Sequence, residues 1–139
     1  MRVEFYAIEK PRFSGKPLEL VCVLAQKAFE SDTPTLILVE AMADAEALDE
    51  LLWSWADDAY IPHQVAGDDD DADCPILIVP AEIDTPTRPL MVNLRARAAP
   101  DGAIRVIELI PDDEAEKNAA RARWTAYKRR GHEPVKVVV

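Results

Sequence analysis

Apolar residues follow two distinct periods along the chain, and the alternation between these periods outlines the fold. "RVEFYAI" (Arg2 to Ile8) is short and rich in β-branched and aromatic residues, which predicts a strand, and the breaker-rich "EKPRFSGKP" follows it as a loop. From Leu18 to Glu30 the apolar residues recur at three- and four-residue spacing, which predicts an amphipathic helix. "TPTLILVE" (Thr33 to Glu40) is nearly all apolar and predicts a strand buried on both faces.

The next two elements continue this alternation. "ADAEALDELLWSW" (Ala43 to Trp55) predicts a second helix with Asp44 as its N-cap. After a polar loop, "PILIVP" (Pro75 to Pro80) predicts a third apolar strand. Because strands and helices alternate, we expect a parallel sheet with right-handed crossovers.

The C-terminal half adds strands and the best-bounded helix. "PLMVNL" (Pro89 to Leu94) and "AIRVIELI" (Ala103 to Ile110) predict two strands, and the linker between them is too short for a crossover helix, so we expect a hairpin or an antiparallel edge there. "PDDEAEKNAARARWTAYKRRG" begins with acidic residues and ends with cations and Gly131, as the helix dipole and a glycine C-cap favour. "PVKVVV" is an extended tail that either adds an edge strand or stays mobile.

These elements predict a single α/β domain over residues 1–139, a three-layer sandwich with a mostly parallel, mixed sheet of about five strands flanked by helices. The fold is expected to be Rossmann-like but without a phosphate loop. "SGK" (Ser14 to Lys16) lacks both the earlier glycine and the following Ser or Thr of such a loop, and no GxGxxG occurs. We therefore expect no nucleotide cofactor.

Charge narrows the classes of function. Lys and Arg number 16 against 26 Asp and Glu, a net charge of −10, which is the wrong sign for a protein that coats nucleic acid. No secretory signal core and no apolar run of about 20 residues are present, so we expect a soluble cytoplasmic protein. Cys22 and Cys74 lack metal-ligand spacing and are expected to be reduced thiols.

The sequence offers little for catalysis. His63 and His132 stand without a nucleophile partner, and we interpret them as loop hydrogen-bonding residues. "GDDDDADC" lacks the alternating ligands and central glycine of a calcium loop, so Asp68 to Asp73 are expected to form an exposed acidic loop. We predict no metal site, no cofactor and no enzymatic activity.

Aromatic residues point to protein contacts. Trp53 and Trp55 are separated by one residue and cannot share a helical face, so one of them is expected to be exposed. For Trp53 a core role and an interface role are weighted equally, whereas Tyr60 favours an interface, because an exposed ring with a polar atom suits protein contacts.

The last helix carries a stripe of cations around an aromatic residue. Lys117, Arg121, Trp124 and Lys128 share one face, while Tyr127 can pack on the sheet. Such a patch suits a short acidic peptide with an apolar end. Two alternatives stay open: a solvated face without a partner, and a direct binder of single-stranded nucleic acid that stacks bases on Trp124 and Tyr127.

Three segments together resemble a known family. "LDELLWSWADDAYIPHQVAG" (Leu48 to Gly67), a third strand that ends in proline, and "ARARWTAYKRRG" after "ELIPDDE" are similar to the chi subunit of bacterial DNA polymerase III holoenzyme over nearly the whole chain. The resemblance implies a noncatalytic α/β protein that pairs with the psi subunit and joins the clamp loader through it. It also implies binding of the acidic, Phe-ended C-terminal tail of single-stranded DNA-binding protein at the replication fork, near the nucleoid.

The resemblance also assigns site residues. It places the cations of the tail site on Lys117 and Arg121, its aromatic residue on Trp124 and its apolar strand-end residue on Ile110. The next lysine of the family falls on Thr125, and we expect Lys128 or Arg123 to compensate.

A second set of residues follows from the same resemblance. It implies a psi-binding face at Trp53 and Tyr60, with Ile61 and Pro62 shaping the loop. Another holoenzyme subunit or a repair helicase is an alternative partner for this face. "GDDDDADC" and the "VKVVV" ending match no part of the family pattern.

Overall fold

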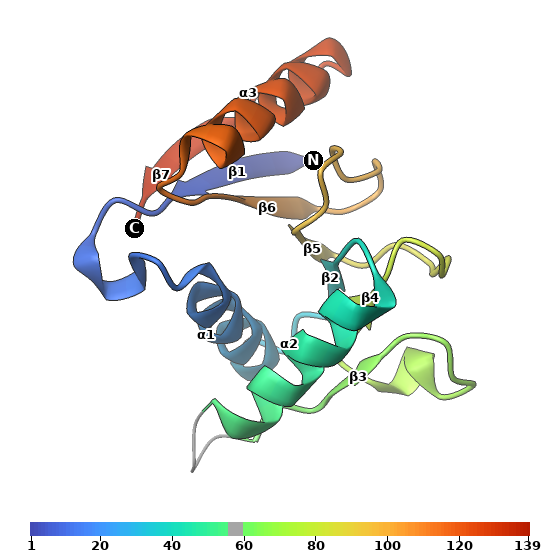
Figure 1. Ribbon diagram of the computed structural model, residues 1–139. Helices are drawn as coiled ribbons and strands as arrows, with labels where there is room; N and C mark the ends of the chain where they lie inside the picture. The colour runs from blue at the N-terminus through green and yellow to red at the C-terminus, as the bar shows by residue number, and fades with distance from the viewer. Residues whose placement is uncertain (56–59) are drawn as a thin grey trace.

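The computed structural model describes residues 1–55 and 60–139. They form one seven-stranded sheet with α-helices on both faces (Figure 1). The strands are β1 (Arg2–Ala7), β2 (Thr35–Leu38), β3 (His63–Val65), β4 (Ile76–Val79), β5 (Leu90–Asn93), β6 (Arg105–Ile110) and β7 (Val135–Val138). The helices are η1 (Pro11–Phe13), α1 (Pro17–Glu30), α2 (Met42–Ser54), η2 (Asp71–Asp73) and α3 (Glu114–Arg129).

The strand order in the sheet is β3-β4-β2-β5-β6-β1-β7, and every pair of neighbours is parallel. This confirms the Rossmann-like α/β fold class. Two strands exceed the expected set. β3 is a three-residue strand inside the expected polar loop, and β7 is the C-terminal tail, which adds an edge strand next to β1.

The prediction of a hairpin or an antiparallel edge between the strands β5 and β6 is wrong. β5 and β6 run parallel, with Leu90 opposite Arg105 and Asn93 opposite Glu108. The chain between them returns without a helix, and hydrogen bonds hold this irregular crossover, from Asn93 Nδ2 to the Arg97 carbonyl at 2.8 Å and from the Ile104 amide to the Pro89 carbonyl at 2.9 Å. A short linker thus excluded a crossover helix but not a parallel pairing.

Helices α1 and α2 cover one face of the sheet, and α3 lies on the opposite face over β1, β6 and β7 (Figure 1). Each face has its own cluster of buried apolar side chains. β2 and β4 are buried along their whole length, as strands between two helical layers must be.

The ends of the helices are fixed by local hydrogen bonds. The expected N-cap at Asp44 is corrected: α2 begins after Ala41, and the Asp44 carboxylate at the third helical position accepts a hydrogen bond from the Ala41 amide at 3.1 Å. α3 begins after Asp113, whose side chain accepts from the Glu116 amide at 3.0 Å. At the other end Gly131 has φ +92° and its amide donates to the Lys128 carbonyl, which confirms the glycine stop.

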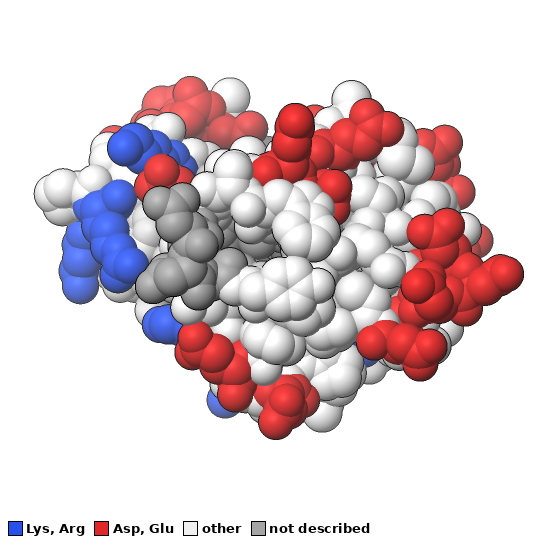
Figure 2. All heavy atoms as spheres, turned by 90° about the horizontal axis from the view of Figure 1, so that it is seen from below, with Lys and Arg blue, Asp and Glu red and all other residues white. Residues whose placement is uncertain are grey.

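Charges are unevenly distributed on the surface that carries α1 and α2. In Figure 2, seen from below Figure 1, acidic side chains gather at the end of the molecule where β3 and η2 lie and also follow the upper and lower edges, while Lys and Arg lie mainly at the opposite end. Uncharged surface lies between them. Within the described ranges, no helix combines the length and the apolar character needed to span a membrane.

Candidate functional site

A pocket of about 580 Å³ opens between α3 and the carboxyl ends of β1 and β6. After β1 the chain passes to α1 on one face of the sheet, and after β6 it passes to α3 on the other (Figure 1). Neighbouring parallel strands whose connections leave toward opposite faces create a crevice at their carboxyl ends, and such crevices are the usual ligand sites of open α/β sheets. The strand topology therefore explains where this pocket lies.

The inner wall of the pocket is apolar. Phe5 and Ala7 of β1, Ile110 at the end of β6, and Ala120 and Trp124 of α3 supply it. The rings of Phe5 and Trp124 lie with centroids 5.0 Å apart and are tilted by 50°. Because Phe5 is fully buried, it gives the half-exposed indole of Trp124 a fixed support. The result is a rigid aromatic surface that an incoming apolar side chain can contact.

Three cations surround this wall: Lys117 and Arg121 of α3, and Lys136 of β7. Arg121 donates to the Asn118 side chain at 2.7 Å, and Lys136 Nζ lies 3.8 Å from a carboxylate oxygen of Glu9. These contacts are exposed, so they exchange readily for the carboxylates of a ligand.

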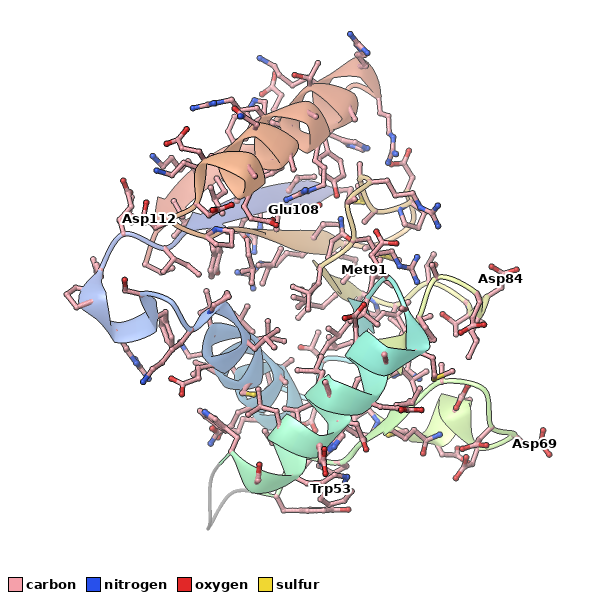
Figure 3. The ribbon with its side chains drawn as sticks, viewed as in Figure 1. Trp53, Asp69, Asp84, Met91, Glu108 and Asp112 are labelled. Atoms are coloured by element: carbon pink, nitrogen blue, oxygen red, sulfur yellow. The ribbon has the colours of Figure 1, made fainter. Side chains whose placement is uncertain are left out.

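Lys117 has acidic neighbours of its own. Its Nζ lies 3.1 Å from a carboxylate oxygen of Asp112, the residue labelled at the start of α3 in Figure 3, and 3.8 Å from one of Glu114. The hydrogen bond to Asp112 raises the pKa of Lys117, so this ammonium stays charged. A ligand carboxylate must compete with Asp112 for it.

The structure brings together four of the six residues expected at the tail site, namely Ile110, Lys117, Arg121 and Trp124. Thr125 and Lys128 are exposed and do not line the pocket. The Thr125 hydroxyl donates back to the Arg121 carbonyl at 3.1 Å, within the helix itself.

Arg123, one of the two residues expected to compensate for Thr125, does not line the pocket. Its side chain is buried and forms an ion pair with Glu108 at 2.8 Å on the sheet-facing side of α3. The third cation of the pocket is instead Lys136, which was not singled out for this site from the sequence. Only the pairing of β7 with β1 brings Lys136 opposite Phe5, and this pairing is not visible in the local pattern of "PVKVVV".

A buried polar cluster holds α3 to the sheet beneath the pocket. Glu108 lies between β6 and α3 (Figure 3) and accepts hydrogen bonds from Asn93 Nδ2 at 2.7 Å, from the Tyr127 hydroxyl at 2.5 Å and from Arg123. The Ala99 amide donates to the same hydroxyl at 2.8 Å. Burial raises the pKa of Glu108, and burial beside that carboxylate raises the pKa of Tyr127. Tyr127 is therefore a core residue with no face open for stacking.

A second candidate surface lies at the end of α2. Trp53 is 55% exposed and Tyr60 66% exposed, and their rings lie with centroids 5.9 Å apart. The Trp53 ring also lies 4.6 Å from the ring of the buried His63. Trp55, by contrast, packs against the core, as the one-residue separation of the two tryptophans requires. Of the two loop residues expected here, Ile61 is buried and Pro62 is half-buried.

Residues 56–59, which belong to the quoted motif, lie outside the described residues. The loop beyond them is fastened by His63. Its Nδ1 lies 2.6 Å from the Ile61 carbonyl oxygen and its Nε2 lies 3.1 Å from the Asp49 carbonyl oxygen. The interpretation of His63 as a hydrogen-bonding residue is confirmed, and the bonds fix the aromatic surface to α2.

The acidic loop is also ordered by its own hydrogen bonds. Burial acts to raise the pKa of Asp71, but hydrogen bonds from the Gly67 amide at 2.8 Å and from Gln64 Nε2 at 2.8 Å outweigh it and lower the pKa below its usual range. In the part of the chain that the structure describes, no group of three His, Cys, Asp or Glu side chains is arranged to hold a metal ion. The described geometry thus offers a charged peptide-sized pocket and an aromatic surface.

Solved structures share the fold but little sequence. The chain aligns over 99% of its length with Saccharomyces cerevisiae Dbp5 bound to RNA and ADP BeF3, at a TM-score of 0.70 and 16% identity, and with T4 UvsW at 0.58 and 10%. It spans about two fifths of each of these proteins, 41% in both cases. At this identity the likeness concerns the fold alone.

Sequence relatives are more specific. A family model described as DNA polymerase III chi subunit, HolC, matches residues 1–135. DNA polymerase III subunit chi of Pseudomonas aeruginosa is 32% identical, with 94% of this chain and 92% of that protein covered, and the subunit of Escherichia coli is 29% identical, with 79% and 77% covered. The chain therefore belongs to the chi-subunit family of DNA polymerase III, whose members are accessory and not catalytic subunits.

Proposed function

We propose that this chain is a replication adaptor with two binding sites, one for the psi subunit of the clamp loader and one for the acidic C-terminal tail of single-stranded DNA-binding protein. The observation that carries the proposal is the pocket between α3 and β1, where an apolar wall and three cations converge. This combination matches a peptide that ends in an aromatic residue preceded by carboxylates.

Each part of the pocket has a task in this proposal. The terminal aromatic side chain lies against Trp124, Ile110 and the Phe5 support, and its burial supplies the nonpolar part of the affinity. Arg121 binds a carboxylate through its planar group of N–H donors, because a guanidinium matches two carboxylate oxygens at once. Lys117 and Lys136 attract the remaining acidic residues as point charges.

The exposed pair Trp53 and Tyr60 supports the proposed psi site. Two large exposed aromatic rings in contact are typical of the anchors of protein interfaces, and the hydrogen bonds of His63 hold the loop in place before a partner arrives. The same surface suits another holoenzyme subunit or a repair helicase that presents an apolar segment.

Direct binding of single-stranded nucleic acid is the weaker proposal. Stacking requires aromatic faces open to solvent, but Tyr127 is fully buried and Trp124 is half-buried and packs against the Phe5 ring. The net charge of −10 also repels a phosphate backbone.

Fluorescence anisotropy with a labelled acidic, Phe-ended peptide tests the tail site. Arg121→Ala is expected to weaken binding by about tenfold or more, because a hydrogen bond to a charged group contributes about 1.5–3 kcal/mol. Arg129→Ala is the matched control, since Arg129 is an exposed cation of the same helix outside the pocket. Equal affinities of the folded Arg121→Ala variant and the unaltered chain would refute the proposed site.

A further inference from the structure

A second groove, of about 810 Å³, lies on the face of the sheet opposite to the tail pocket. On this face α1 and α2 are the only described α-helices for a seven-stranded sheet, and the sheet extends past α1 toward β1 and β7 (Figure 1). The groove occupies the space between α1 and β1, β6 and the end of β7. Apolar side chains of η1, α1, β5, β6 and β7 form its floor: Phe13, Leu20, Leu24, Leu90, Ile107 and Val138.

Cations line this groove. Arg2, Lys10, Arg12 and Lys27 are exposed, and Arg105 lies deeper and bonds to the Tyr6 hydroxyl at 2.7 Å. Asp32 is the only acidic side chain among the described residues of the lining. This positive groove stands out on a chain whose net charge is −10.

Some of these cations are already paired and others are available. Glu4 pairs with Arg105 and lies 3.7 Å from Arg2 Nε. Within residues 1–55 and 60–139, no carboxylate lies within ion-pair distance of Lys10, Arg12 or Lys27. A ligand carboxylate can therefore pair with any of these three cations without displacing a carboxylate of the described residues.

We propose that this groove binds an acidic protein segment that also carries apolar side chains, at a site separate from the tail pocket and from the Trp53 surface. The cations select the negative charge, and the aliphatic floor selects the apolar side chains. A nucleic acid strand fits less well, because it needs open aromatic faces. Phe13 is buried, and the Arg12 guanidinium lies over its ring at 4.8 Å.

The two basic pockets lie on opposite faces of the same strands. Phe5 and Ala7 of β1 face the tail pocket, while Tyr6 between them lines the groove, because successive strand residues point to opposite sides. A peptide in one pocket therefore leaves the other open. The chain is expected to hold two acidic segments at once.

The test is a titration of a peptide probe into the 139-residue chain, in which amide NMR chemical shifts report binding. The probe is a synthetic helix of about four turns with Glu on one face and Leu on the other. Two comparison probes separate the sources of binding: the same peptide with Ser in place of Leu, and an oligothymidylate of similar length. We expect saturable shifts at Tyr6, Val23 and Leu24, and weaker binding of both comparison probes.

Charge-reversal variants locate the site. Arg12→Glu with Lys27→Glu is expected to weaken binding of the Glu/Leu peptide by about tenfold, as two exposed ion pairs turn into repulsions. The pair Lys128→Glu and Arg129→Glu makes the same change in net charge outside both pockets and should leave binding unchanged.

Four results would overturn the proposal. They are shifts confined to the tail pocket, equal affinity of the Arg12→Glu/Lys27→Glu variant, tighter binding of the Ser peptide or the oligothymidylate, and no saturation up to about 1 mM peptide. The shift map of the unaltered chain decides the location of the site even where a variant is poorly folded. Arg121→Ala, which tests the tail site, leaves this groove intact, so the two proposals fail separately.

Discussion

The Glu108 carboxylate and the Arg123 guanidinium lie 2.8 Å apart in the interior, where they join the centre of β6 to the centre of α3. Arg123 therefore points toward β6, while Arg121 and Trp124 of the same helix line the pocket beside β1 and β7. The ion pair fixes the rotation of α3 about its axis. That rotation determines which cations of this strongly basic helix reach a ligand.

Removal of one partner of this ion pair is expected to destabilise the protein strongly. Arg123→Ala leaves the buried Glu108 carboxyl without its only cationic partner in the described core, which costs about 3–5 kcal/mol of the free energy of unfolding. Arg129→Ala, at an exposed position of the same helix, should change it by less than about 0.5 kcal/mol. Urea denaturation monitored by circular dichroism measures the free energy of unfolding of both variants. Similar free energies of unfolding would show that the buried ion pair does not stabilise the fold.

Lys136 is expected to matter more for the tail peptide than Lys128. Lys136 lines the pocket, whereas Lys128 lies one turn beyond Trp124 and outside it. Lys136→Ala should weaken binding by about two- to fivefold, as loss of one exposed charge contact does, and Lys128→Ala should have little effect. Anisotropy titrations at low and high salt measure both affinities. A larger loss of affinity in Lys128→Ala than in Lys136→Ala would show that the third cation of the tail site lies on α3.

The exposed aromatic pair is expected to affect binding of psi and not folding. Trp53→Ala with Tyr60→Ala should abolish or greatly weaken association in calorimetric titration with psi, because interface aromatic residues often cost about 2 kcal/mol or more each. Tail-peptide affinity should stay unchanged. Leu48→Ala, at a buried position of the same helix, should instead cost about 2–5 kcal/mol of stability. Loss of both binding activities together with the fold in the aromatic variant would assign these rings to the core.

The two thiols are expected to be slow to react. Burial raises the pKa of Cys22 from 9.0 to about 11, and burial also raises the pKa of the half-buried Cys74. At pH 8 the reactive thiolate of Cys22 is therefore about a hundredfold scarcer than for an ordinary thiol. Reaction with a thiol reagent should modify Cys74 first and reach Cys22 at a normal rate only in denaturant. Fast labelling of Cys22 in the folded chain would contradict its burial.

Local patterns in the sequence predicted the elements that depend on neighbouring residues. The apolar runs at β2 and β4, the amphipathic spacing of α1, and the acidic start and glycine stop of α3 were all predictable, because periodicity and capping act over a few residues. The stripe of Lys117, Arg121, Trp124 and Lys128 followed from the helical period in the same way, although Lys128 lies outside the pocket. The family resemblance added Ile110 to this site, and the structure brings Ile110 together with Lys117, Arg121 and Trp124.

Tertiary structure decided what depends on pairing between distant segments. The parallel register of β5 and β6 comes from an irregular crossover held by hydrogen bonds, and the sequence does not specify the direction in which such a linker returns. Lys136 lines the pocket because β7 pairs with β1. Arg123 lies outside it because its side chain pairs with Glu108 beneath α3. A helical period places residues on a face, but only packing against the sheet decides which face meets the ligand.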